Sequence, residues 1–143
     1  MSCFLDTSAL YAILDADDRN HSQSSRLFAD LLQLEMPLVC SDYILIETFA
    51  LVQSRLGMDA VRTLSDDILP VLRVFWTDEQ LFGSALSACL AANRKRLRLV
   101  DCVSFAMMRQ RGISRVFTFD SHFAEQGFYV VGGNTDTTRE SAT

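Results

Sequence analysis

The stretch CFLDTSAL at residues 3–10 gives the clearest indication of the fold. Its apolar run ends at Asp6, two hydroxyl residues follow, and apolar residues then return with helical spacing. This pattern predicts a buried strand that carries Asp6 at its carboxyl end and is followed directly by a helix. Because ligands of open α/β sheets bind just outside the carboxyl ends of the strands, Asp6 is the first candidate functional residue.

The rest of the chain alternates short apolar segments with longer amphipathic ones, which favours an α/β fold with a parallel sheet and helices on both faces. About five strands are expected, at residues 3–5, 37–40, 71–75, 115–119 and 128–131. Helices are expected over residues 8–16, 20–34, 41–56, 59–69, 77–92 and 100–111. The expected helix-end signals are Ser41 as an N-cap, Thr77 with Gln80 as a capping box, and Gly57 and Gly112 as terminators.

The length and composition limit the classes of protein to which this chain can belong. A length of 143 residues predicts one domain, over residues 1–131, with a polar frayed tail over residues 132–143. The net charge of −5 excludes a generally basic nucleic-acid coat, although local basic groups or metal ions still allow a nucleic-acid enzyme. The four cysteines form no C-x-x-C pair, and we find neither a signal peptide nor an apolar run of about 18–20 residues. These features predict a cytoplasmic protein without a membrane span.

Four acids stand out by their positions: Asp6, Glu47, Asp101 and Asp120. Asp6 and Asp120 each follow an apolar strand, and Asp101 lies in the first turn of an expected helix. The helical neighbours of Glu47 are largely apolar, so its side chain is expected on the buried face of its helix. An unpaired carboxylate there is costly, so Glu47 needs a partner.

Two solutions are open for these four acids. Each Asp taken alone is also a reasonable helix N-cap, and Glu47 has the alternative of pairing with an Arg from elsewhere in the chain. However, no Lys or Arg lies beside any of the four acids in a suitable apolar setting of the sequence. The other solution is that the acids converge on a hard divalent cation, Mg²⁺ or Mn²⁺, whereas no His or Cys spacing supports zinc.

Several of these segments together resemble the PIN-domain nucleases, and among them the VapC-type toxins of prokaryotic toxin–antitoxin pairs. The resemblance covers about residues 2–131 and is carried by residues 4–10, Glu47, residues 99–101 and residues 117–123. It implies a PIN-like parallel sheet, a pocket that binds Mg²⁺ or Mn²⁺, and an RNA substrate. The four acids match the acids of the family, and Ser8 matches a hydroxyl that helps to orient the site. The resemblance also implies a homodimer that is silenced by a cognate antitoxin protein.

Other residues have two plausible interpretations. A basic connector, residues 93–98, is expected either to steer RNA phosphate towards the site or to be an ordinary solvated loop; its charged members are Arg94, Lys95, Arg96 and Arg98. His122 is considered as a general base, although a partly exposed turn residue is the simpler interpretation. Trp76 is expected in the core.

The main hypothesis is a metal-dependent endoribonuclease in which Asp6, Asp101 and Asp120 hold the metal. Glu47 is expected to hold a second ion or a water molecule. One alternative is a PIN-like interaction protein without nuclease activity, and another is a nuclease of the same fold that acts on DNA or in RNA processing. A phosphoacceptor signalling module is disfavoured, because such a site resembles a receiver domain that needs a late lysine, and none follows Lys95.

Overall fold

The computed structural model describes residues 1–132, so the expected tail lies, from residue 133 onwards, outside the described residues. Within residues 1–132 there is one five-stranded sheet in the order β3-β2-β1-β4-β5, and all its neighbouring strands are parallel. The strands are β1 (Cys3–Leu5), β2 (Leu38–Ser41), β3 (Leu72–Phe75), β4 (Arg115–Phe117) and β5 (Tyr129–Val130). The expected parallel α/β sheet is therefore confirmed.

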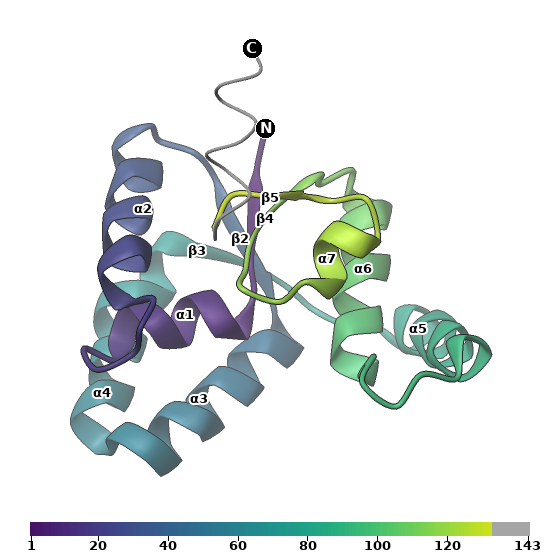
Figure 1. Cartoon of the computed structure of the whole chain (residues 1–143), viewed down its shortest axis with the longest axis horizontal. Helices are drawn as coiled ribbons and strands as arrows, with labels where there is room; N and C mark the ends of the chain where they lie inside the picture. Colours follow the sequence, from purple (N-terminus) through teal and green to yellow (C-terminus); the bar gives the residue numbers. More distant parts are fainter. Residues whose placement is uncertain (133–143) are drawn as a thin grey trace.

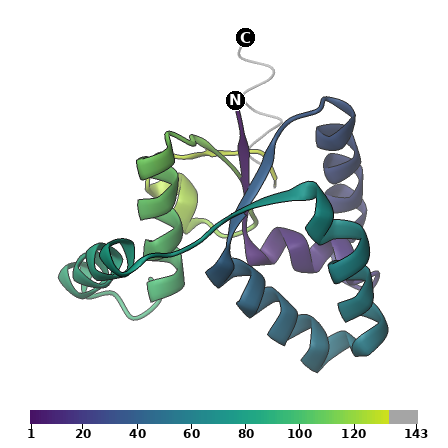
Figure 2. The same cartoon turned by 180° about the vertical axis from the view of Figure 1, so that it is seen from behind.

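Helices cover both faces of this sheet. Figure 1 shows α1 and α2 on one side of the strands and α6 and α7 on the other, and Figure 2 shows the same arrangement from behind. The helices are α1 (Thr7–Leu14), α2 (His21–Gln33), α3 (Asp42–Leu56), α4 (Met58–Thr63), α5 (Glu79–Ala92), α6 (Leu99–Arg111) and α7 (His122–Glu125). None of the helices in residues 1–132 combines the length and apolar character that a bilayer crossing requires.

The central strand β1 is completely buried, because it has a neighbouring strand on each side and helices on each face. Phe4 lies opposite Val39 of β2 and Val116 of β4, so three apolar side chains form one layer of the core. The register also pairs Leu5 with Phe117, which places the carboxyl ends of β1 and β4 side by side. Residues that follow these two strands are therefore brought together.

Two of the expected helix-end signals are confirmed in full detail. The Ser41 hydroxyl accepts a hydrogen bond from the Ile44 N–H at 3.0 Å, which caps α3. Gly112 ends α6 with φ of +68°, a left-handed conformation that glycine adopts without a steric penalty. Sequence reasoning finds such ends because the capping chemistry is local.

The expected regular helix over residues 59–69 is wrong. Helix α4 ends at Thr63 and continues as a π-helix, η1 (Leu64–Ile68), and then as a 3₁₀ turn, η2 (Leu69–Val71). The Leu69 N–H bonds to the Leu64 carbonyl, one residue further back than in an α-helix. The cause is Pro70, whose ring would collide with the carbonyl four residues before it in a regular α-helix.

The expected capping box at Thr77 is also wrong, because Asp78 is the N-cap of α5 and its carboxylate accepts from the Leu81 N–H at 2.7 Å. The Thr77 hydroxyl and N–H instead donate to Asp42 at the start of α3, at 2.7 and 2.9 Å. Trp76 is not in the core either, since it is 73% exposed. It follows the edge strand β3, where the chain leaves the sheet towards α5.

This capping arrangement predicts different costs for two neighbouring substitutions. Asp78→Ala removes the acceptor for the Leu81 N–H and should lower the free energy of unfolding by about 1 kcal/mol. Gln80→Ala changes an exposed side chain outside the cap and should cost a few tenths of a kcal/mol at most. Urea denaturation followed by circular dichroism measures both, and equal costs would show that Asp78 is not the cap.

Candidate active site

The four acids meet at the carboxyl ends of the central strands. Asp6 follows β1, Asp120 follows β4, and Glu47 lies on α3, the helix that begins directly after β2 (Figure 1). An open groove of about 680 Å³ lies there. It is lined by Asp6, Thr7, Ser8, Glu47, Ala50, Leu51, Ser54, Arg55, Arg98 and Asp120. The fold thus gathers side chains that are up to 114 positions apart in the sequence.

Asp6 is the most deeply buried of the acids that line the groove, with 6% of the residue exposed. One of its carboxylate oxygens accepts hydrogen bonds from the Ser8 hydroxyl at 3.0 Å and from the Thr118 hydroxyl at 2.9 Å. Burial raises the pKa of Asp6 to about 6 despite these two hydroxyls, and the negative charge of Asp120 adds to the rise. The site therefore holds an ionised Asp6 only at a cost, which a nearby cation would offset.

The two hydroxyls also fix the loop that carries Asp120. The Phe119 N–H donates to the Ser8 hydroxyl at 3.0 Å, and the Asp120 N–H donates to the Thr118 hydroxyl at 3.0 Å. This geometry is consistent with the supporting part expected of Ser8. Thr118 was missed in the sequence, where the signal available was one hydroxyl inside an apolar run that leads to Asp120.

Asp101 reaches the site from the first turn of α6 and is 2% exposed. Its carboxylate accepts from the Arg98 backbone N–H at 3.0 Å, so the acid also closes the start of its helix. Burial raises the pKa of Asp101, and Asp120 raises it further. The capping alternative is thus partly realised for Asp101, whereas Asp6 occupies an N-cap position without any side-chain capping bond.

A basic partner lies beside the acids, so the alternative that Glu47 pairs with an Arg from elsewhere in the chain is realised. The Arg98 guanidinium is 3.4 Å from a Glu47 oxygen and 3.8 Å from an Asp101 oxygen. The pair joins residues 51 positions apart, so no local pattern could have indicated it. The Glu47 side chain is 28% exposed, because the apolar face of α3 at this point borders an open groove rather than the core.

The other members of the basic connector lie away from this pair. Arg94 pairs with Glu125 at 3.3 Å, and both side chains are about half exposed. Lys95 and Arg96 are exposed. Within the described part of the connector, Arg98 is therefore the basic side chain that enters the groove.

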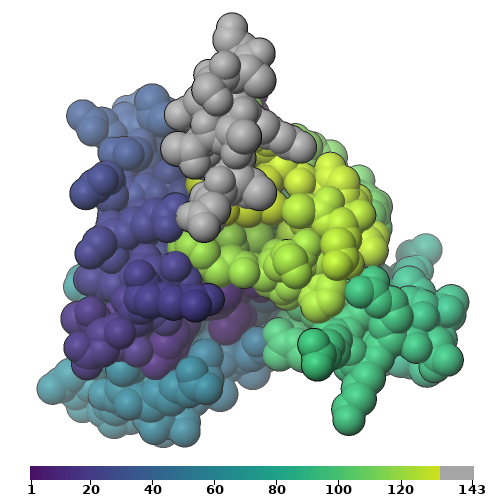
Figure 3. Space-filling model, in the orientation of Figure 1, coloured from purple at the N-terminus to yellow at the C-terminus, as the bar shows by residue number. Residues whose placement is uncertain are grey.

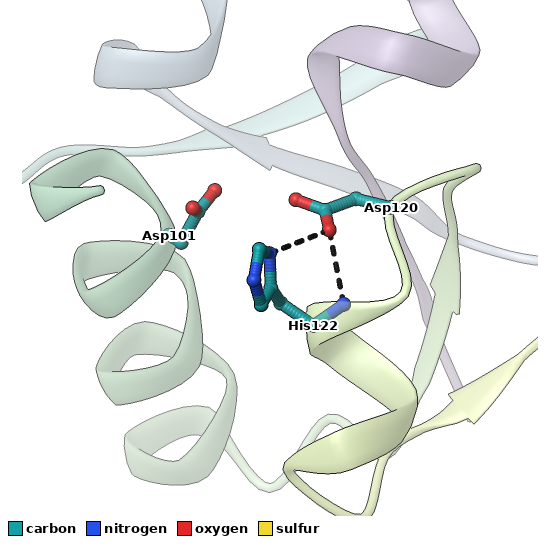
Figure 4. Close-up of side chains that lie close together, drawn as sticks. All are labelled: Asp101, Asp120 and His122. Atoms are coloured by element: carbon teal, nitrogen blue, oxygen red, sulfur yellow. Dashed lines mark hydrogen bonds and ion pairs between the residues drawn. The ribbon is translucent and has the colours of Figure 1, made fainter. Parts of the chain in front are cut away.

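A metal ion is plausible from the side chains themselves. Asp101, Asp120 and His122 each offer one ligand atom, and these three atoms lie within 4.8 Å of one another. Figure 4 shows the His122 ring between the two carboxylates. The buried ring atom Nδ1 lies 2.8 Å from an Asp120 oxygen, so a nitrogen and a carboxylate oxygen face each other at this point. Two carboxylates and a ring nitrogen are a donor set that fits a divalent cation, and this group of three does not include Asp6 or Glu47.

Comparisons with known proteins agree with this geometry. Residues 3–129 match the PIN domain family. The chain is 32% identical, over 129 residues, to the 23S rRNA-specific endonuclease VapC20 of Mycobacterium tuberculosis, an alignment that covers 90% of this chain and 96% of the relative. The relative carries the same name in two strains of that organism.

Two solved structures share the fold. The crystal structure of Mycobacterium tuberculosis VapC20, described as a sarcin–ricin loop cleaving toxin, has a TM-score of 0.78 and 30% identity and covers 89% of this chain and 96% of its own. The crystal structure of FitAcB from Neisseria gonorrhoeae has a TM-score of 0.68 at 19% identity, over 91% of this chain and 96% of its own, and shows the shared fold. Together with the family match, these findings confirm the resemblance drawn from the sequence: the chain belongs to the PIN domain family and is similar to VapC-type toxins.

Proposed function

We propose that this protein is a divalent-metal-dependent endoribonuclease and the toxin of a toxin–antitoxin pair. The observation that carries the proposal is the meeting of the four acids at one edge of the sheet, in a chain 32% identical to an rRNA endonuclease. A PIN-like interaction protein without catalysis would have no need to keep four carboxylates together at the cost of their mutual repulsion. A scaffold role is therefore the weaker explanation.

The four acids divide into two groups by the roles that we assign to them. Asp6, Asp101 and Asp120 would hold Mg²⁺ or Mn²⁺, and Glu47 on the facing helix would hold a second ion or orient a water molecule. The cation, when bound, supplies a Lewis acid that activates water and stabilises charge on the phosphoryl oxygens. Ser8 and Thr118 keep the Asp6 carboxylate in one orientation through their two hydrogen bonds.

The proposed substrate is a structured RNA, and the first candidate is a ribosomal RNA loop, because the relative is named for 23S rRNA. Arg94, Lys95, Arg96 and Arg98 would contact its phosphates from the connector beside the groove. Lys95 and Arg96 are exposed, so they are available to such a ligand.

In a cleavage assay, joint replacement of Lys95 and Arg96 by Ala should raise KM and leave kcat nearly unchanged, because phosphate contacts outside the catalytic centre contribute to binding. An unchanged KM would show that these two residues do not contact the RNA.

The proposal includes two protein partners in the cytoplasm, a second copy of this chain and a cognate antitoxin. Helix α5 packs on α6 and projects from the body at the lower right of Figure 3. It leaves three large apolar side chains exposed at a spacing of four residues: Phe82, Leu86 and Leu90. Trp76, just before α5, is exposed as well. An apolar surface of this kind is typical of a protein–protein interface.

The oligomeric state tests this surface. Leu90→Asp places a charge at the most exposed of the three apolar side chains of α5 and should convert a dimer to a monomer in sedimentation velocity at micromolar concentration. Leu34→Asp is a matched control, because Leu34 is 71% exposed at the end of α2, away from α5. A wild-type chain that sediments as a monomer would reject the homodimer.

Loss of a proposed ligand tests the catalytic assignment. Asp101→Asn keeps the size of the side chain but removes its charge, and it should slow cleavage of a ribosomal RNA loop more than about 100-fold. Cleavage by the wild type should require Mg²⁺ or Mn²⁺ and stop in a chelator. Asp17→Asn, at an exposed acid in the turn after α1, is the matched control. A chain that cleaves equally well after Asp101→Asn, or in chelator, would contradict the proposed mechanism.

The buried Asp6 carboxylate predicts how stability depends on pH and on the metal. The folded chain raises the pKa of Asp6 from 3.8 to about 6, so the folded state holds the proton more tightly than the unfolded state. Ionised Asp6 therefore destabilises the metal-free protein above pH 6, by at most about 3 kcal/mol, and the penalty fades as pH falls below that value.

Asp6→Asn removes this penalty and should raise the free energy of unfolding at pH 7.5 in chelator, with a smaller gain at pH 5.5. In the presence of Mn²⁺ the wild type should be the more stable of the two proteins, because it gains the free energy of metal binding that the variant lacks. Urea denaturation at the two pH values, with and without Mn²⁺, measures both effects. Equal stability of the two proteins under all four conditions would show that Asp6 is not a strained metal ligand.

A further inference from the structure

His122 lies beside Asp101 and Asp120 and has no role in the four-acid scheme. We propose that its imidazole is a nitrogen ligand of the same cation, and that it biases the site towards Mn²⁺ over Mg²⁺. This inference rests on the proposed function, because it adds a ligand to the metal site of that nuclease. It assigns the histidine a role in selecting the ion rather than in accepting a proton.

Three separate elements bring the ligand atoms together. Asp101 comes from the first turn of α6, Asp120 from the loop after β4, and His122 from the first residue of α7, as Figure 4 shows. The group is held in place by aromatic packing: the buried Phe123 ring meets Phe105 of α6 edge-on, with centroids 4.9 Å apart. The start of α7 is thereby pressed against α6, which directs the imidazole towards Asp101.

The contact between His122 and Asp120 has the geometry of two neighbouring ligands. Nδ1 lies 2.8 Å from an Asp120 oxygen. Two adjacent ligands of an octahedral ion, each about 2.1 Å from it, are roughly 3 Å apart. This nitrogen and this oxygen are therefore spaced as two neighbouring ligands of one ion would be.

The same carboxylate is fixed from the backbone. The His122 N–H donates to the Asp120 oxygen at 2.9 Å, so one short turn orients both ligands. The His122 side chain is 17% exposed and the Asp101 side chain 2%, which limits the water that can compete for the Nδ1 lone pair.

The chemistry of the ring then selects between the two ions. Mg²⁺ prefers oxygen ligands and gives up its waters reluctantly, whereas imidazole suits transition metals. A site of carboxylates alone would treat Mg²⁺ and Mn²⁺ similarly. One imidazole added to those carboxylates should therefore strengthen Mn²⁺ binding selectively.

The experiment uses the full chain with Mn²⁺ or Mg²⁺ alone, without RNA. The chain has two histidines, so His122→Gln is matched by His21→Gln at the start of α2. Calorimetric titration should give a Mn²⁺ dissociation constant about 10- to 100-fold higher for His122→Gln and a Mg²⁺ constant changed by less than about 3-fold. The His21 variant should bind both ions as the wild type does. Equal losses for Mn²⁺ and Mg²⁺, or none, would overturn the assignment.

A spectroscopic measurement on the wild type needs no variant. Pulsed electron paramagnetic resonance of the Mn²⁺ complex should show coupling to a directly bound nitrogen, and the pattern should change when the protein is made with isotopically labelled histidine. Mn²⁺ that binds and supports cleavage without nitrogen coupling would overturn this inference and leave the proposed nuclease standing. A chain that binds neither ion and cleaves no RNA would overturn both.

Discussion

The burial of one carboxylate at the end of the central strand is the constraint on which the rest of the structure depends. Strand β1 is covered on every side, and Asp6 at its carboxyl end is only 6% exposed. Ionisation there is resisted, and burial raises the pKa of Asp6 to about 6. The hydroxyls of Ser8 and Thr118 offset part of this cost by donating to one carboxylate oxygen. A nearby positive charge must offset the rest of the cost of ionising Asp6.

The structure contains one such charge already. Arg98 stands between Glu47 and Asp101, and its own pKa is raised by Glu47 and Asp101 although partial burial works against this. The side chain is 57% exposed, so the ion pair is partly screened by water and holds the acids only loosely. In the proposed enzyme a divalent cation would balance the negative charge of the acids in place of Arg98. The Arg98 guanidinium would then be able to contact a phosphate.

The fold alone would not have indicated a function. FitAcB shares the fold at 19% identity, and a parallel sheet with helices on both faces supports many activities. The site favours a nuclease, because carboxylates from the end of β1, from α3, from α6 and from the end of β4 share one groove or one ligand cluster. The similarity to an rRNA endonuclease adds the chemical class of the substrate to be tested first.

The sequence alone predicts the parallel sheet, the helix ends at Ser41 and Gly112, and the four acids as candidates. These features are local: apolar runs predict buried strands, Ser41 and Gly112 act on the residues beside them, and an acid after an apolar run marks a strand end. Only the tertiary structure decided the partners. Arg98 meets Glu47 across 51 positions and Thr118 meets Asp6 across 112, and such contacts leave no periodic trace in the sequence. The same holds for the exposure of Trp76, which depends on where the chain leaves the sheet.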